Sequence, residues 1–322
     1  MSVEPEVSYR KRLDDLRNET ELMDCLEAVR GTLLSVNFEK EYERIENFEC
    51  RDEDVWVTSF PKSGTTWTQE MVWLLGNNLN YDGAKEGLDK RYTFMEGTAL
   101  ITGYIQDKPF ELTIPDPVDT LNGISGRRFI KSHLPWHLLP KQIRDGTRKP
   151  KIIHVVRNPK DVCVSYYHYT KIFSILHSSL EDYFKKFISD KFLYSPYWPA
   201  VFGYWKKRDL PNLLILRYEE MIKDMPSVIK KTAEFLGVFV AEEDMTKLLE
   251  HLSFKQMKNN KAINYEQVAG MFLQQGALNG QLNLIRNGKI GSYKEELTED
   301  MINLLEVWCQ MNNEDTGLKF DV

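Results

Sequence analysis

Apolar runs that lead directly into helix-like segments constrain the fold of this chain more than any other feature. Residues 55–60, the start of 151–171 and residues 212–221 each form a continuous apolar run, and a helix-like segment follows each one. Strands that lack polar alternation are typical of a parallel sheet covered on both faces. The pattern therefore predicts an α/β fold with three layers, a central parallel sheet flanked by helices.

Shorter signals complete this prediction. "RFIKSHLP" (128–135) reads as a short strand that ends at Ser-His, and Asn158 is expected to cap a helix that begins at Pro159. Further helices are expected at residues 66–76, 180–189, 226–237 and 298–312, with Gly237 ending the third. Residues 10–50 read as helical and charged. No repeat or interdomain linker interrupts residues 1–322, so a single domain is expected.

Two segments read as loops with a functional role. Residues 81–126 are rich in Gly, Pro, Asp and Thr, and residues 258–285 are rich in Asn, Gln and Gly. Loops of this length are uncommon in a packed domain unless they bind something. We therefore expect both segments to contribute to a binding pocket.

Composition excludes several partners and sites. A net charge of −6 disfavours a general binder of nucleic acid or acidic membranes, and no run approaches the ~18 apolar residues of a membrane span. The N-terminus has no apolar signal segment, and four cysteines without a CxxC pair suit reduced thiols. A cytoplasmic protein without nucleic-acid or membrane partners is expected. Pro135 between His133 and His137 breaks the helix that a zinc motif would need, so no metal is expected.

The loop after the first apolar strand has the build of an anion-binding site. In "SFPKSGTTW" (59–67) a strand leads through Lys62, Ser63 and Gly64 into a helix N-terminus, where free N–H groups and the positive end of the helix dipole meet. Ligands of parallel sheets bind at the carboxyl ends of the strands. Because His133, Arg157 and Tyr218 also follow strand-like runs, we expect them to meet Lys62 at one edge.

A nucleotide kinase or ATPase is one interpretation of this loop. Its phosphate-binding loop would place the lysine after the second glycine, whereas here Lys62 precedes Gly64. A Mg²⁺ ion would need a carboxylate at the end of a neighbouring strand, but "KIIHVVRNP" ends in Arg157. The sequence disfavours this function.

A second interpretation needs no metal. "SFPKSGTTW" resembles the 5′-phosphosulfate loop of the cytosolic sulfotransferases, and "KSHLP" (131–135) resembles their catalytic segment. "RNPKDVCVSYYHY" (157–169), "RYEEM" (217–221), "LSFKQM" (252–257) and "RNGKIG" (286–291) match later segments of that family in the same order. The resemblance runs from about residue 35 to the C-terminus. Six ordered matches are far more specific than one loop.

The resemblance implies the donor 3′-phosphoadenosine 5′-phosphosulfate, with adenosine 3′,5′-bisphosphate as its product, and no metal. A donor with two separated phosphate groups needs two anion-binding sites, and the planar fork of an arginine suits the terminal 3′-phosphate. The residues expected to bind the donor are Lys62, Ser63, Gly64, Thr65, Thr66, Trp67, Arg157, Ser165, Tyr218, Ser253, Phe254, Met257, Arg286, Asn287 and Gly288.

The family resemblance also implies the catalytic residues. It places His133 as the base that takes the proton of the acceptor, with Lys131 beside the acceptor oxygen. Lys62 is expected to stabilise charge on the leaving phosphate. No covalent intermediate is required.

The acceptor is expected to be a small hydroxylated molecule. The divergent segments carry aromatic residues, which suit a phenol, a steroid-like alcohol or another flat alcohol. These residues are Phe94, Tyr104, Trp136, Tyr169, Phe173 and Phe272. Two alternatives stay open: a dehydratase of the retinol-dehydratase branch, in which a sulfated alcohol loses sulfate, and a non-catalytic nucleotide binder, which an intact His133 and Lys62 disfavour.

Two departures from the family pattern bear on affinity and assembly. Asn287 stands where the family usually has a lysine, which removes one cation near the 3′-phosphate. The family's dimer motif is half present: Lys294 and Thr298 match, but Glu299 and Asn303 replace its valine and glutamate. A homodimer is therefore an open expectation.

Overall fold

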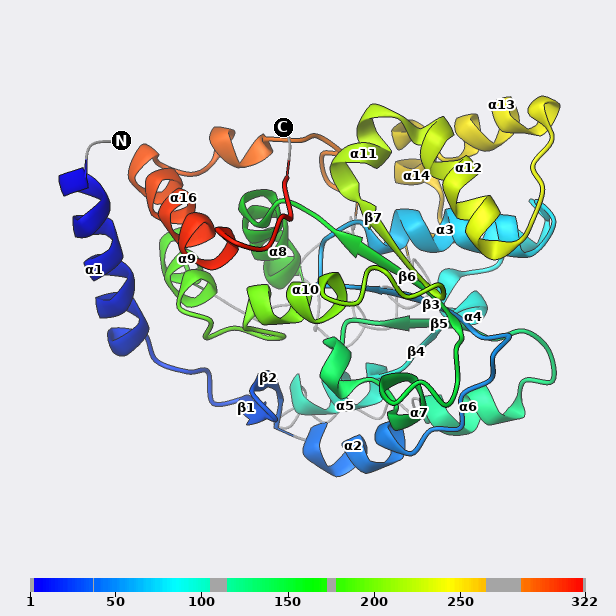
Figure 1. Ribbon diagram of the computed structural model, residues 1–322, viewed down its shortest axis with the longest axis horizontal. Helices are drawn as coiled ribbons and strands as arrows, with labels where there is room; N and C mark the ends of the chain where they lie inside the picture. Colours follow the sequence, from blue (N-terminus) through cyan, green and yellow to red (C-terminus); the bar gives the residue numbers. More distant parts are fainter. Residues whose placement is uncertain (1–2, 37, 105–114, 173–177, 265–284, 321–322) are drawn as a thin grey trace.

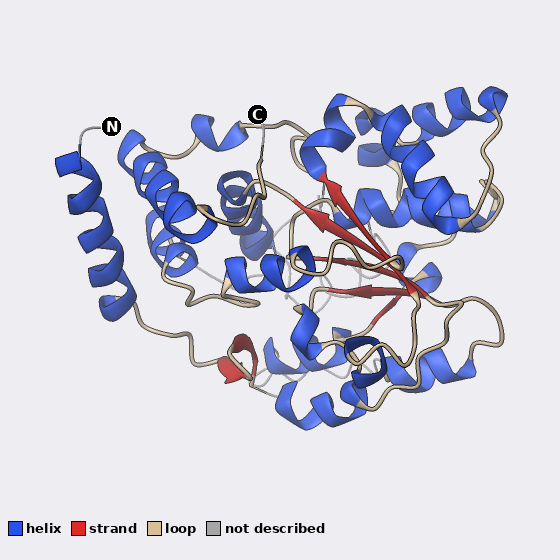
Figure 2. Cartoon of the chain, viewed as in Figure 1, coloured by secondary structure: helices blue, strands red, loops and turns tan. Residues whose placement is uncertain are grey.

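A central sheet of five parallel strands organises the chain. The computed structural model describes residues 3–36, 38–104, 115–172, 178–264 and 285–320. The strands lie in the order β4-β5-β3-β6-β7, and every neighbouring pair is parallel (Figures 1 and 2). They are β3 (Val55–Ser59), β4 (Thr93–Phe94), β5 (Phe129–Ser132), β6 (Lys151–Val156) and β7 (Leu213–Arg217). The predicted α/β class with a parallel sheet is confirmed.

The sheet separates two hydrophobic cores, because successive side chains of a strand point to opposite faces. In β3, Trp56 belongs to one core, whereas Val55 and Val57 belong to the other. The first core packs against α8 (Pro159–Ile172), α9 (Leu180–Ile188), α10 (Tyr197–Trp205) and α16 (Glu299–Asn313). The second core packs against α3 (Thr65–Gly76), α12 (Met225–Leu236), α13 (Glu242–His251) and α14 (Phe254–Asn259). These are the two helical layers that continuous apolar strands require.

The predicted helices and their caps agree with the structure. Helices at 66–76, 180–189, 226–237 and 298–312 correspond to α3, α9, α12 and α16. The Asn158 side chain accepts a hydrogen bond of 3.0 Å from the Lys160 N–H at the start of α8. Gly237 ends α12 in a left-handed conformation, with φ of 72°.

The N-terminal region contains a hairpin that the sequence did not predict. Helix α1 (Val3–Glu19) packs beside α16, where Arg12 forms a two-pronged ion pair with Asp300 at 2.7 and 2.8 Å (Figure 1). Strands β1 (Leu26–Val29) and β2 (Thr32–Ser35) then pair antiparallel, and α2 (Phe38–Glu46) follows. The expectation of an all-helical 10–50 region was wrong, because Arg30 and Gly31 both have positive φ and form a tight turn.

The segment 81–126 contains short regular elements where only loop was expected. They are η1 (Gly83–Lys85), α4 (Leu88–Arg91), β4, α5 (Gly97–Tyr104) and α6 (Pro117–Gly123). Its polar residues act as caps: Asp116 accepts from the Asp119 N–H, and Pro117 begins α6. Turn-forming composition here marks frequent changes of direction between short elements, rather than one long loop. Most of the other predicted loop, 258–285, lies outside the described residues.

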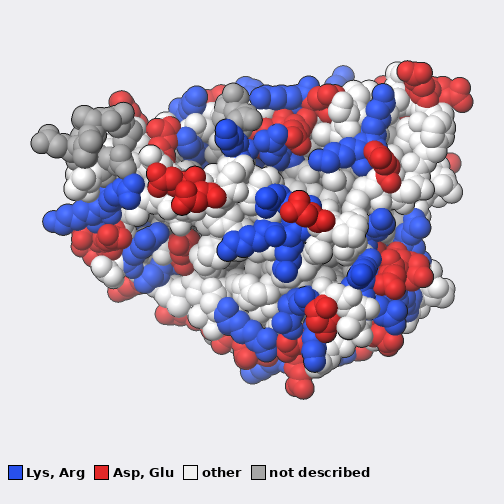
Figure 3. Space-filling model, viewed as in Figure 1, with Lys and Arg blue, Asp and Glu red and all other residues white. Residues whose placement is uncertain are grey.

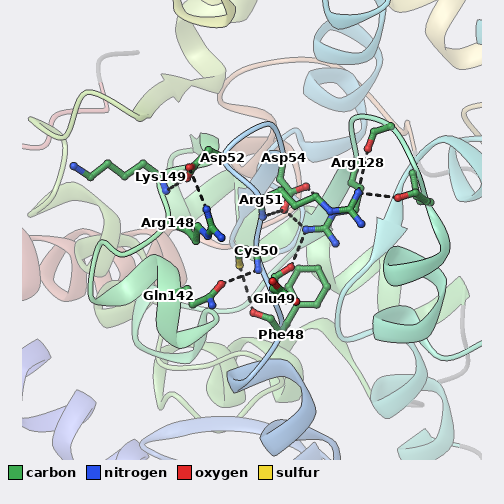
Figure 4. A network of polar contacts seen from close by, with 12 residues as sticks. Phe48, Glu49, Cys50, Arg51, Asp52, Asp54, Arg128, Gln142, Arg148 and Lys149 are labelled. Carbon is green, nitrogen blue, oxygen red and sulfur yellow. Dashed lines mark hydrogen bonds and ion pairs between the residues drawn. The ribbon is translucent and has the colours of Figure 1, made fainter.

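The amino end of the sheet is held by buried charge. Asp54, just before β3, accepts hydrogen bonds from Nε and Nη2 of Arg128 at 2.6 and 2.5 Å, and both side chains are almost fully buried (Figure 4). Two basic residues nearby have acidic partners, since Arg144 pairs with Glu46 and Arg148 with Asp52. On the face drawn in Figure 3 basic and acidic side chains are interspersed. No helix of the described ranges has the length and apolar character needed to cross a bilayer.

The remaining elements are short connections. Strand β7 ends at Arg217, and Tyr218 begins a helix rather than extending the strand to residue 221 as expected. These connecting elements are η2 (Trp136–Leu138), α7 (Lys141–Arg144), α11 (Tyr218–Lys223) and η3 (Ser292–Glu295).

Candidate active site

The carboxyl ends of four strands bring the predicted residues together. His133 follows β5, and its Nδ1 lies 2.9 Å from the carbonyl oxygen of Ser59 at the end of β3. Arg157 follows β6 and donates from Nη1 to the Lys62 carbonyl at 3.1 Å. Its guanidinium carbon also lies 4.2 Å from the ring centroid of Tyr218, which follows β7. The meeting of these residues at one edge agrees with the sequence prediction.

Residues 60–66 comprise the loop after β3 and the first two residues of α3, and their conformation requires a glycine at position 64. Both Lys62 and Gly64 have positive φ, 68° and 108°. A Cβ atom on Gly64 would lie 2.7 Å from the Tyr218 ring, so a larger residue would displace the tyrosine. The first N–H groups of α3 have no partner within their own helix. The Ser63 hydroxyl is also buried, with no hydrogen-bond partner in the described part of the chain. This "Lys62 loop" thus offers several donors to an anion.

The Lys62 amine lies in an unusually cationic environment. Its Nζ is 4.7 Å from the ring centroid of Tyr169. Burial, followed by the positive charges of Arg157, Lys131 and Arg286, lowers the pKa of Lys62 to about 7. An anion bound among these cations would remove the repulsion and favour the charged amine.

His133 is held in one tautomer. Because the Ser59 carbonyl can only accept, Nδ1 must carry the hydrogen, which leaves the lone pair on Nε2. Burial is the main cause that lowers the pKa of His133 well below its usual value, and the charge of Lys131 adds to it. The rings of Phe94 and Tyr194 stand edge-on to the imidazole, each with a centroid separation of 5.5 Å. The histidine is therefore neutral and fixed in orientation, as a general base needs to be.

Lys131 and Phe94 form a pair across the sheet edge. They are direct partners in the β4–β5 ladder, and the Lys131 Nζ lies 4.1 Å from the Phe94 ring centroid. Burial lowers the pKa of Lys131 to about 8, while the negative charge of Glu96 opposes this shift. The Lys131 amine is thus a weaker base than an ordinary lysine, and it lies on the strand that His133 follows.

A second set of donors includes Arg157. This "Arg157 site" comprises Arg157, Ser165 on α8 and residues 286–288. The Arg157 Nη2 donates to the Lys289 carbonyl at 3.4 Å, and its Nε is buried without a partner among the described residues. Gly288 has φ of 63°, and a Cβ atom there would lie 2.3 Å from the ring of Phe254. Ser165 is partly buried on the same helix that Arg157 precedes.

Arg286 is oriented by an acidic partner. Its Nη1 donates to Glu296 at 2.7 Å, and Glu296 also bonds His168 of α8 at 2.6 Å. The Arg286 Nε is buried, and no residue of the described ranges accepts from it. Asn287 is partly buried beside it and supplies no charge. The Arg157 site therefore has less positive charge than it would have with a lysine at position 287.

Asp161 anchors this late segment and was not among the site residues predicted from the sequence. Its carboxylate accepts from the Gly291 N–H at 2.8 Å, the Ser292 hydroxyl at 3.2 Å and the Tyr293 N–H at 3.3 Å. The signal available was an aspartate in the first turn of α8, four residues after Arg157. Asp161 fixes the 286–293 segment to the helix that carries Ser165.

The residues predicted to bind the purine of the donor, and their neighbours on α14, fall into two groups. The Trp67 indole donates to the Leu252 carbonyl at 2.9 Å and stands edge-on to Tyr218 at 6.0 Å, so both rings line the start of α3 and α11. Phe254 is 42% exposed and rests on Gly288, where it is available to a ligand. Ser253, however, caps α14 through the Gln256 N–H, and Met257 is buried in the second core. These two residues stabilise α14, the helix that Phe254 begins.

Of the aromatic residues expected to face the acceptor, two contact the site lysines and one is buried in the core. Phe94 and Tyr169 contact the Lys131 and Lys62 amines, as described above. Trp136 is buried in the first core and stands edge-on to Tyr204 of α10. The side chain of Tyr104, and Phe173 and Phe272 entirely, lie outside what the structure describes. No three His, Cys, Asp or Glu residues of the described ranges gather as metal ligands.

Comparisons with known proteins agree with this geometry. A family model described as a sulfotransferase domain matches residues 52–317. Luciferin sulfotransferase of Photinus pyralis is 42% identical over 309 residues, which are 95% of this chain and 82% of that protein. Sulfotransferase 1 family member D1 of Rattus norvegicus is 32% identical, over 96% of this chain and 98% of its own. The crystal structure of retinol dehydratase with retinol and PAP superposes with a TM-score of 0.84 at 30% identity, covering 96% of each chain.

Proposed function

The chain belongs to the sulfotransferase family, and we propose that it moves a sulfuryl group from 3′-phosphoadenosine 5′-phosphosulfate to the hydroxyl of a small apolar acceptor. One observation carries the proposal: Ser59 contacts both His133, the proposed base, and the Lys62 loop, the proposed phosphate-binding site. Its carbonyl fixes the tautomer of His133, and its hydroxyl bonds Thr65 at 2.6 Å in the Lys62 loop. A base for the acceptor and donors for a phosphate thus share one residue.

The two donor sets suit a nucleotide with two separated phosphate groups. The Lys62 loop would bind the 5′-phosphosulfate, and the Arg157 site the 3′-phosphate. Three buried donor atoms support this fit, because the Ser63 hydroxyl and the Nε atoms of Arg157 and Arg286 have no partner among the described residues. Buried donors left unpaired are costly, and phosphate oxygens would satisfy them. Trp67, Tyr218 and Phe254 would hold the purine.

In the proposed reaction, Nε2 of His133 takes the proton of the acceptor hydroxyl. The acceptor oxygen forms a bond to sulfur while the bond between sulfur and the 5′-phosphate oxygen breaks. The electron pair of that bond stays on the phosphate, where the charged Lys62 and the Lys62 loop N–H groups stabilise it. Lys131 lies next to the acceptor and stabilises its oxygen as the proton leaves. The reaction needs no metal.

The acceptor class follows from Phe94 and Tyr169, which would lie against a flat ring. Relatives named for luciferin sulfation and solved with retinol or androsterone bound support a small cyclic or polyene alcohol or phenol. The likeness to retinol dehydratase favours one alternative, in which the sulfated alcohol loses sulfate to give an alkene. A single domain, a cytoplasmic location and a homodimer stay predictions.

A panel of phenols, steroid-like alcohols and retinoid alcohols with radiolabelled donor tests the proposal. Labelled sulfate esters are the expected products, and a dehydrated compound with free labelled sulfate would support the alternative. A matched reaction with His133→Ala shows whether transfer depends on the site. The proposal fails if no acceptor takes label, or if transfer requires Mg²⁺ and ATP.

A further inference from the structure

A carboxylate outside the predicted site contacts the segment that carries the base. Glu96 lies between β4 and α5 and is only 1% exposed. One carboxylate oxygen accepts from the backbone N–H of His133 at 2.5 Å and from the Tyr194 hydroxyl at 3.1 Å. The other accepts from the Ser132 hydroxyl at 2.9 Å. Three donors on one buried carboxylate make a defined, fully bonded group.

Glu96 continues a ladder that joins β4 to the catalytic segment residue by residue. Phe94 pairs with Lys131, and the next N–H, that of Met95, donates to the Lys131 carbonyl at 2.9 Å. Glu96 then receives the bonds from Ser132 and His133. Residues 131–133 are therefore each held from the β4 side. The sheet holds the Lys131 carbonyl, and the Glu96 carboxylate holds the Ser132 hydroxyl and the His133 N–H.

The same carboxylate also determines the surroundings of the His133 ring. The Tyr194 hydroxyl bonds Glu96, and the Tyr194 ring stands edge-on to the imidazole at 5.5 Å, as the ring of Phe94 on β4 also does. Movement of Glu96 would therefore shift the backbone of His133 and the aromatic ring of Tyr194 together. Catalytic groups are sensitive to displacements of this kind.

Charge connects Glu96 to Lys131 as well. The negative charge of Glu96 opposes the lowering of the Lys131 pKa that burial causes. Burial in turn raises the pKa of Glu96 to about 7, and the positive charge of Lys131 opposes that rise. Among the described titratable groups, the Lys62 amine and the neutral ring of His133 also face Lys131. Among these groups Glu96 supplies the negative charge.

We propose that Glu96 is a positioning residue for sulfuryl transfer, which fixes the Ser132–His133 backbone and balances the charge of Lys131. This inference rests on the proposed function. If Glu96 had only a structural role, its substitution should have the same effect on activity as substitution of another buried carboxylate next to the sheet. Asp54 is such a residue: it is equally buried and paired with Arg128, but it lies at the opposite end of β3 (Figure 4).

Glu96→Gln is compared with Asp54→Asn in sulfate transfer at saturating donor, with kcat, KM, melting temperature and the pH profile measured for each. Glu96→Gln should lower kcat by about 10- to 100-fold, the effect of a base displaced by a fraction of an ångström to about 1 Å. Its KM for the donor should stay close to the wild-type value, because the described hydrogen-bond partners of Glu96 are Ser132, His133 and Tyr194, which are not donor-binding residues. The alkaline limb of kcat should move to lower pH, since glutamine cannot stabilise the charged Lys131.

Asp54→Asn should lower the melting temperature but leave kcat and the pH profile close to the wild type. If Glu96→Gln does not fold, Tyr194→Phe removes one of the three donors and keeps the carboxylate, and kcat should still fall. A wild-type kcat and pH profile in the Glu96 variant, no loss of kcat in Tyr194→Phe, or equal losses of kcat in the Glu96 and Asp54 variants would overturn the inference. An inactive wild type would instead refute the proposed function.

Discussion

Binding of adenosine 3′,5′-bisphosphate should weaken with rising pH because Lys62 must be charged to hold the 5′-phosphate. The pKa of Lys62 is lowered to about 7 by burial and by three neighbouring cations. A bound phosphate should return it toward its ordinary value. Since only the charged amine attracts the anion, affinity should be full below pH 7 and fall about tenfold per pH unit above it, or about 100-fold across two units. The nucleotide's own phosphate groups lose their last proton near pH 6, so they contribute little in this range.

Titration calorimetry in buffers of different ionisation enthalpy measures both the affinity and the protons taken up. At about pH 8 roughly 0.9 proton should bind per nucleotide, because most of the free protein then carries a neutral Lys62. Lys62→Arg is the matched control, since an arginine stays charged throughout the range. Its affinity should be independent of pH between about 7.5 and 9.5, whatever its absolute value.

Two results would refute this reasoning. A flat profile in the wild type would mean that Lys62 is already charged in the free protein, so that burial does not determine its state. An unchanged slope in Lys62→Arg would assign the proton to another group, of which Lys131, with a pKa lowered to about 8, is the nearest candidate.

Three further predictions concern single residues. Arg157→Ala should weaken adenosine 3′,5′-bisphosphate by ~1.5–3 kcal/mol, the scale of a charge-assisted hydrogen bond, and scarcely affect adenosine 5′-phosphate; equal losses by calorimetry would make Arg157 structural. His133→Ala should lower kcat by ~10²–10⁴ while nucleotide affinity and melting temperature stay unchanged, with phenols affected less than aliphatic alcohols. Gly288→Ala and Gly237→Ala both place a side chain at positive φ and should each cost about 1–2 kcal/mol of stability. Only the first, whose Cβ would lie 2.3 Å from Phe254, should also weaken nucleotide binding, and equal affinities in the two variants would contradict this.

The sheet and the strand-end residues could be predicted because their signals are local. A continuous apolar run, a cap such as Asn158 and a small-residue loop each occupy a few neighbouring positions, and parallel strands bring their ends to one edge by geometry alone. The hairpin β1–β2 could not be predicted in this way. Its second strand bonds the 194–195 backbone, since the Leu33 N–H donates to the Ser195 carbonyl and the Leu33 carbonyl accepts from Tyr194.

The supporting carboxylates were missed for a related reason. Glu96 and Asp161 act through partners far along the chain, Tyr194 for the first and residues 291–293 for the second. Asp161 is marked only by its place in the first turn of α8, and Glu96 stands in no spacing that marks its role. An isolated glutamate or aspartate is usually a surface residue. Their burial becomes visible only once the strands are assembled, because the donors come from segments that are separate in sequence.

The attachment of residues 291–293 to Asp161 has a consequence for how the protein is made and degraded. The five strands are complete once residue 217 has been synthesised, but the segment with Arg286 and Gly288 emerges from the ribosome only later. A nascent or proteolysed chain that ends near residue 264 contains all five strands and the Lys62 loop, but it lacks α16, which packs in the first core. It should lack the segment that Asp161 holds beside Arg157. We expect nucleotide to protect only full-length chains from unfolding, so that the cell's supply of the donor would favour completed molecules over fragments.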